Sequence, residues 1–197
     1  MFDYYSFNDF YLSDTRRKYD AFNGESDSLL KIAELLFDKS NATLRQQEKM
    51  FALTRLVLSS FESNQYTFSD ILFVLVYIKT MKNQLYEKIK HNNYQLQELY
   101  DIFKELFFPD GINLFYMIAR LLYLYNNNQD YENKKQLFDT DAEGKRICLI
   151  KFNFDNESER KNLTDSFGYI EKRWDVRDIE LNYLLNKIDL IEPINKL

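Results

Sequence analysis

The chain has 197 residues, enough for one domain with a sizeable core, and its net charge of −5 argues against a general nucleic-acid binder. Only four Gly and two Pro residues occur, so the secondary-structure elements should be long, which favours helices. The single cysteine excludes an intramolecular disulfide, and the acidic, aromatic start Met1-Phe2-Asp3 does not fit a secretory leader. We therefore expect a cytoplasmic protein.

The first 25 residues place many aromatic side chains among polar ones. Here the spacing of the rings predicts a short helix. Two interpretations are open: the rings pack on a helical core, or they form a surface for a partner. The candidate partner-binding residues are Tyr4, Tyr5, Phe7, Phe10 and Tyr11. A turn follows, and after it we expect a helix that begins near Ser26 or Ser28 and carries the apolar residues of 29–37.

The segment from residue 43 to residue 91 carries the clearest helix signals. Thr43 and Gln46 have the S/T-x-x-E/Q spacing of a capping box, and an amphipathic helix of about five turns should follow them. The all-apolar run 71–78 fits a buried strand or a buried helix. The cap-like spacing of Thr67 and Asp70 favours a helix, which we expect at the centre of the core.

A third, short helix is predicted over 85–90, and another over 96–107. An apolar helix over 114–125 comes next. The run 71–78 is too short to cross a membrane, which takes about 20 apolar residues, so we expect no membrane association.

The chain turns polar from Asn126 to Gly144, which predicts a boundary near residue 128. We expect a helical core domain over 1–128, and over 129–197 a polar linker with a C-terminal helix that packs on the core. That helix is predicted over 169–190, after a polar stretch over 156–168. Alternation over 147–154 allows one short strand. The predicted fold is all-α, an irregular multi-helix bundle around the central apolar helix.

No stretch carries a recognisable catalytic, cofactor or metal motif. The closest approach to a nucleotide-binding P-loop has Asp139 where its first Gly should stand and Arg146 in place of the Ser or Thr that holds magnesium. His91 is the only histidine and Cys148 the only cysteine, too few for a standard zinc site. We therefore expect no enzyme activity, no cofactor and no metal.

One family resemblance lies in the central segment. Three stretches carry it: Leu44-Arg45-x-x-Glu-Lys49, Arg-Leu-x-Leu over 55–58 and Leu-Tyr-Glu-Lys-Ile-Lys over 85–90. They are similar to the helical region that follows the nucleotide-binding core of KAP-type P-loop NTPases. These are bacterial and phage-associated ATPases with relatives in animals. The match covers about residues 28–91. The family motif has Asn and Pro before its arginine, and this chain does not.

The resemblance implies a non-catalytic helical lid or protein-interaction module. Its partner would be a P-loop NTPase core or another protein, and its nucleotide- or partner-contacting residues would be Arg45 and Lys49. The alternative is a nucleic-acid-binding helical protein, because basic residues cluster around Tyr169 and Trp174; they are Arg160, Lys161, Lys172, Arg173 and Arg177. Acidic residues interleave with that cluster and lower its positive potential. A helical enzyme, the third hypothesis, would need a polar pocket lined by titratable groups.

Overall fold

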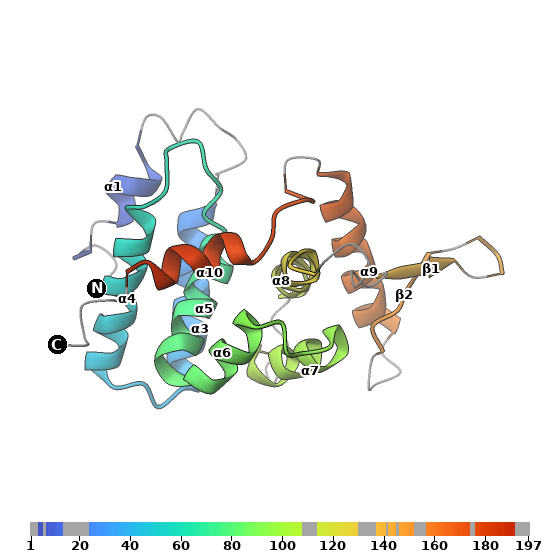
Figure 1. Ribbon diagram of the computed structural model, residues 1–197, viewed down its shortest axis with the longest axis horizontal. Coiled ribbons are helices and arrows are strands. Elements are labelled where there is room, and N and C mark those ends of the chain that lie inside the picture. Colours follow the sequence, from blue (N-terminus) through green and yellow to red (C-terminus); the bar gives the residue numbers. More distant parts are fainter. Residues whose placement is uncertain are drawn as a thin grey trace. The chain divides into compact units, whose positions relative to one another are not determined.

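The computed structural model describes residues 4–5, 7–13, 24–107, 114–129, 137–140, 142–144, 146–151, 157–173 and 176–191 (Figure 1). Within these ranges the protein is mostly helical, as predicted, with nine helices and one hairpin of two short strands. None of the helices in these ranges has the length and hydrophobicity that a membrane crossing requires.

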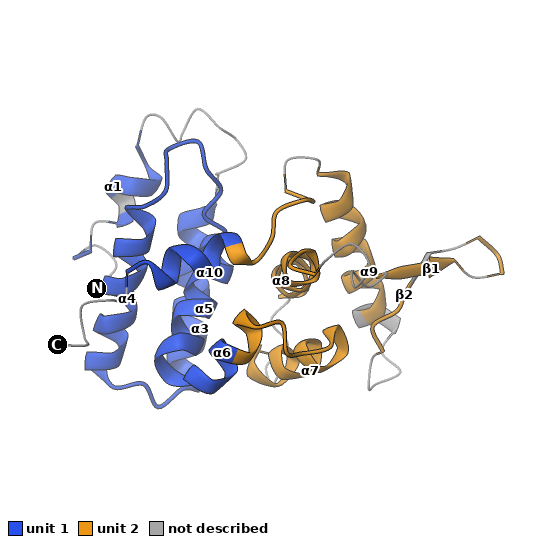
Figure 2. Ribbon diagram, in the orientation of Figure 1, with its two compact units in different colours: residues 1–87, 183–197 blue, residues 88–182 orange. Residues whose placement is uncertain are grey.

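The chain folds into two compact units, which are coloured separately in Figure 2. The first unit combines residues 1–87 with residues 183–197, and the second holds residues 88–182. The first unit is therefore discontinuous in sequence. The boundary expected near residue 128 falls inside the second unit.

The first unit is built around α5 (Ser69–Met81), which packs against α3 (Glu25–Lys39) and α4 (Leu44–Leu58). Every residue from Ile71 to Ile78 is buried. Such a helix is apolar on all sides because neighbours surround it, which explains why its sequence also resembles a buried strand. The prediction of a central apolar helix is confirmed. The unit also contains α1 (Phe7–Tyr11), most of α6 (Asn83–Lys90) and nearly all of α10 (Asn182–Asp189).

The two predicted helix caps of this unit have different outcomes. The capping box at α4 is present: the Gln46 amide donates to Thr43 Oγ1, and the Thr43 amide donates to Gln46 Oε1 at 2.8 Å. The cap expected from Thr67 and Asp70 is wrong, because α5 has no such bond and is preceded by Phe68 in the left-handed region, at φ 46°. Instead the first residue of α3, Glu25, supplies the acceptor: its Oε1 receives the amides of residues 67 and 68 at 3.2 and 3.1 Å.

The second unit packs α8 (Phe115–Asn127) against α7 (Leu96–Phe107) and α9 (Glu157–Lys172). Its hairpin pairs β1 (Phe138–Thr140) with β2 (Arg146–Cys148) in antiparallel register. The strand allowed over 147–154 is thus shorter and begins earlier, and its partner strand was not foreseen. Gly144, from the rejected P-loop candidate, lies between the two strands at φ 79°, a conformation that glycine adopts readily.

The single C-terminal helix predicted over 169–190 is wrong. Two helices occupy this region, α9 and α10, and between them the backbone bonds to α8. The Leu181 amide donates to the Leu124 carbonyl at 2.9 Å, and Asn127 Nδ2 donates to the carbonyls of Arg177 and Ile179 at 2.7 and 2.8 Å. These tertiary bonds replace the intrahelical bonds of a continuous helix. The stretch 156–168, expected only to be polar, forms most of α9.

Candidate functional site

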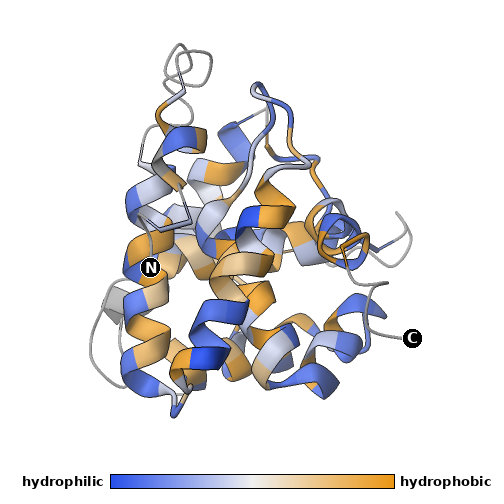
Figure 3. Ribbon diagram, turned by 90° about the vertical axis from the view of Figure 1, so that its left-hand side faces the viewer, coloured by the Kyte–Doolittle hydropathy of each residue, from blue (hydrophilic) through white to orange (hydrophobic). Residues whose placement is uncertain are grey.

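The outward face of α4 gathers exposed basic and apolar side chains. Arg45, Lys49, Ala52 and Leu56 recur at three- or four-residue spacing, so they share one side of the helix, and Leu44 precedes them at its first turn. We call these five residues the α4 surface. The opposite side of α4 is buried in the core of the first unit. In the view from the side of α1 and α4, hydrophilic and hydrophobic residues are interspersed along the helices that face the viewer (Figure 3).

Arg45 and Lys49, the two residues predicted to contact a nucleotide or partner, are both exposed. Neither side chain makes a hydrogen bond or ion pair with another residue in the part of the chain that the structure describes. Arg55 differs, because its Nε donates to the carbonyl oxygen of Tyr5 at 3.1 Å. The two exposed cations are therefore available to a ligand or partner.

The apolar members of the α4 surface are unusually open to solvent. Leu44 is 63% exposed and Leu56 is 54% exposed. Single exposed leucines are ordinary on protein surfaces, but Leu56 shares its side of the helix with two cations that have no partner among the described residues, and Leu44 lies about 100° around the axis from Arg45. Arginine is among the residue types enriched at protein interfaces.

The N-terminal aromatic residues divide between core and surface. Phe7 is fully buried with its ring 5.7 Å from that of Phe51, and Tyr11 is buried with its hydroxyl 2.9 Å from Ser69 Oγ. Tyr5 and Phe10 are half-buried. Of the five candidate partner-binding residues, only Tyr4 is largely open, at 82% exposure. The surface that this segment offers to a partner is therefore mainly Tyr4.

Tyr5 fixes this segment against α4. Its ring stacks on Phe51 at 6.3 Å between centroids, and its hydroxyl donates to the carbonyl oxygen of Glu48 at 3.3 Å. With the bond from Arg55, Tyr5 is held at three points of α4. The Tyr4 ring lies 5.1 Å from the Tyr5 ring, edge to face. The structure thus brings Tyr4 close to the helix that carries Arg45 and Lys49, residues about 40 positions away in sequence.

Sequence reasoning missed a buried polar cluster in the first unit. Lys79 of α5 is 8% exposed, and its Nζ lies 2.7 Å from Oδ1 of Asp189 in α10. The same carboxylate oxygen accepts the hydroxyl of the fully buried Tyr86 at 3.0 Å. Because one acceptor serves two donors, the cluster ties the C-terminal helix to residues 79–86.

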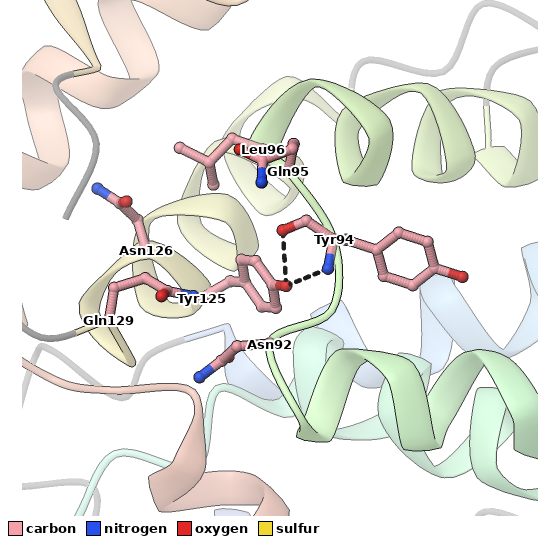
Figure 4. A pocket seen from close by; sticks show the side chains of 7 residues that line it. All are labelled: Asn92, Tyr94, Gln95, Leu96, Tyr125, Asn126 and Gln129. Carbon is pink, nitrogen blue, oxygen red and sulfur yellow. Dashed lines mark hydrogen bonds between the residues drawn. The ribbon is translucent and has the colours of Figure 1, made fainter. Parts of the chain in front are cut away.

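The second unit contains a cavity of about 130 Å³ between the start of α7 and the end of α8 (Figure 4). Among the described residues, its walls carry carboxamides, tyrosines and one leucine; they are Asn92, Tyr94, Gln95, Leu96, Tyr125, Asn126 and Gln129. The ring of Tyr125 points at the backbone of Tyr94, whose amide donates to the phenol oxygen at 3.0 Å and whose carbonyl accepts the phenol proton at 2.9 Å. Burial raises the pKa of Tyr125 above its ordinary value; the hydrogen bond from the Tyr94 backbone opposes this shift, and the charges of Tyr94 and Glu98 add to it. A phenol that stays protonated suits a structural tie better than acid–base chemistry near neutral pH.

The remaining chemical candidates lie apart from these sites. Cys148 is buried in β2, and desolvation raises the pKa of its thiol, which disfavours the nucleophilic thiolate. Among the described residues, no three His, Cys, Asp or Glu side chains meet in a way that could hold a metal ion. In the basic cluster predicted around Tyr169, Arg177 pairs with Asp178 at 3.1 Å, and Trp174 lies outside the described residues.

No protein-family model, curated protein or solved structure matches this chain. The likeness to the helical region of KAP-type NTPases therefore stays a prediction from the sequence, and the α4 surface is judged by its own geometry and chemistry.

Proposed function

We propose that this protein is a non-catalytic helical lid or protein-interaction module, and that it docks on its partner through the α4 surface. The observation that supports this role is the pairing of two exposed cations, Arg45 and Lys49, which have no partner among the described residues, with two open leucines on one capped helix. The partner favoured by the sequence resemblance is a P-loop NTPase core. We further propose that the protein works in the cytoplasm.

A rigid surface suits such a role because association then orders few additional groups. The Thr43–Gln46 box fixes the first turn of α4, and the buried side of the helix rests on the central α5. Arg45 and Lys49 thus extend from a backbone that is already ordered. On a P-loop NTPase core, a guanidinium at this position would be suited to a bound phosphate or to an acidic side chain, since arginine binds both in a bidentate manner.

The test combines binding with ATP turnover. We expect the purified chain alone to hydrolyse no ATP above background, and to bind a purified KAP-type core lacking its own helical region. Calorimetry should show that Arg45→Ala weakens this binding, and that Lys31→Ala, a matched change at an exposed lysine of α3, does not. ATP hydrolysis by the chain alone, abolished by a point substitution, would contradict the non-catalytic role. Equal binding by all three proteins would exclude the α4 surface as the docking face.

The alternative, a nucleic-acid-binding protein, stays a prediction, and the geometry of its basic residues supports it less than the α4 surface supports docking. Arg160 and Lys161 lie in the first turns of α9, and Lys172 lies at its end, so these charges are spread over a helix of 16 residues. Salt-dependent binding of DNA or RNA that is lost on reversing these charges would support the alternative.

A further inference from the structure

We infer that the partner segment that docks on the α4 surface is an acidic amphipathic helix, with two carboxylates against Arg45 and Lys49 and apolar side chains against Leu44 and Leu56. This inference rests on the proposed docking role of that surface, and it adds the chemistry of the partner.

The charges of this region favour an acidic partner. Arg45 and Lys49 are exposed without a partner among the described residues, and Arg55 adds a third positive charge beside Tyr5. The exposed Glu48 supplies one negative charge on the same helix. The α4 region is thus locally positive on a chain whose net charge is −5. An acidic segment would be repelled by most of the chain and attracted here, which gives both orientation and selectivity.

The spacing of the groups fits a helical partner. Arg45 and Lys49 are one helical turn apart, and carboxylates three or four residues apart on a facing helix have a matching separation of about 5–6 Å between Cβ atoms. Leu56 follows Lys49 by seven residues, which is about 10 Å along the axis at 1.5 Å per residue. A partner helix would therefore carry two acidic residues one turn apart and an apolar residue about two turns farther on.

An extended partner fits this surface less well. A segment that binds as a strand needs a sheet edge for its backbone hydrogen bonds. The described residues of the first unit are helical or lie in turns, and both strands of the described chain belong to the second unit. A helix satisfies its own backbone groups and leaves only side chains to match.

A phosphate backbone is also a poorer occupant. Binding to nucleic acid would use Arg45 and Lys49 but would leave Leu44, Leu56 and Tyr4 exposed to water or against charged phosphates. An acidic helix with apolar anchors covers both kinds of group, and it would cover Arg45 and Tyr4, whose residue types are enriched among the hot spots of protein interfaces.

The inference is tested by selecting helical peptides from a random displayed library on the full chain. Binders are then counter-screened on the double charge reversal Arg45→Glu/Lys49→Glu, with Lys31→Glu as the matched control on α3. We expect the enriched peptides to carry Asp or Glu at i and i+4 with an apolar residue about seven positions away. Their affinity should fall at least about tenfold on the double reversal and stay unchanged on the control.

Three outcomes decide between this inference, the proposed function and a nucleic-acid ligand. Some binders could lose affinity on Leu44→Ala/Leu56→Ala yet carry no acidic pattern and bind the charge-reversed protein equally well. That result would overturn the inference of an acidic partner and keep the docking role. Binders that respond to no change on the α4 surface would overturn both. Salt-dependent binding of a labelled DNA or RNA duplex that is lost on the charge reversal would replace the acidic helix by a nucleic acid. All four substituted positions are exposed, so circular dichroism should show an unchanged fold.

Discussion

Replacing Asp189 by Ala would remove the carboxylate oxygen that receives both Lys79 Nζ, at 2.7 Å, and the Tyr86 hydroxyl, at 3.0 Å. The Lys79 side chain is 6% exposed, so its charge would remain in a desolvated site. Removing one member of a buried ion pair costs about 3–5 kcal/mol. Two features place this pair near the lower limit: the Asp189 side chain is 26% exposed, and Lys79 Nζ keeps a contact of 5.0 Å with the Tyr86 ring. We expect a loss of about 3 kcal/mol in the free energy of unfolding.

The assay is urea unfolding followed by circular dichroism at 222 nm. The matched control is Asp178→Ala, whose partner Arg177 is exposed; that ion pair should contribute less than about 1 kcal/mol.

A double substitution, Lys79→Met/Asp189→Leu, should recover most of the lost stability, because apolar residues of similar size often replace a buried ion pair without loss. The reasoning would be refuted if Asp189→Ala cost less than 1 kcal/mol, or if the double substitution were less stable than Asp189→Ala. Either result would mean that Lys79 reaches water or another acceptor when Asp189 is absent.

Three further changes test the second unit and the α4 cap. Tyr125→Phe should cost about 1–3 kcal/mol at pH 7 by freeing the amide and carbonyl of Tyr94. The folded pKa of Tyr125 is raised, so the stability that this phenol contributes is fully present below its ordinary pKa of about 10 and is lost as the pH rises through the folded pKa. The urea midpoints of the wild-type protein and Tyr125→Phe should therefore differ less at pH 11 than at pH 9. Cys148 should react slowly with a disulfide reagent at pH 8 in the native protein and rapidly in urea; equal rates would contradict its burial. Thr43→Ala should lower stability by about 1 kcal/mol through loss of the bond to the Gln46 amide, and an unchanged thermal midpoint would mean that water replaces that bond.

Local sequence rules accounted for the helices whose signals lie within a few residues. The Thr43–Gln46 box was visible because its two members are three positions apart, and it forms as predicted. The outward position of Arg45 and Lys49 also followed from the amphipathic pattern of α4. By contrast, Glu25 caps α5 from 42 and 43 positions away, and Lys79 meets Asp189 across 110 positions. No spacing rule connects residues so far apart.

The second unit shows how tertiary bonds overrule local pattern. The polar run that begins at Asn126 suggested a linker, yet Asn126 and Asn127 are buried in the last turn of α8. Asn127 is accommodated because its amide holds the backbone before α10. The helical row of α9 was within reach of sequence reasoning, since Leu163, Phe167 and Ile170 have the spacing of a buried face; the many polar neighbours concealed it.

The candidate site was predictable in part for the same reason. Which positions of α4 face outward depends on helical periodicity, a local property. Which of the N-terminal rings are buried depends on where α4 and α5 lie, and no periodicity contains that information. Phe7 and Tyr11 became core residues through contacts with Phe51 and Ser69, whereas the adjacent ring of Tyr4 stayed open.

The discontinuous first unit has a consequence for synthesis on the ribosome. Domains usually fold as units, beginning with those made first, but this one lacks α10 until residues 183–189 have been translated. Residues 88–182 are complete earlier, and Asn128 joins the two ends of that insert by bonding the side chain of Asn92 and the amide of Asn182. A premature stop codon near residue 182 would therefore leave the second unit complete and the first unit without α10. The unit that loses a helix is thus the one whose translation begins first. In such a truncated product, the buried ammonium of Lys79 would lose the carboxylate of Asp189, making residues 1–87 the part most exposed to chaperones and proteases.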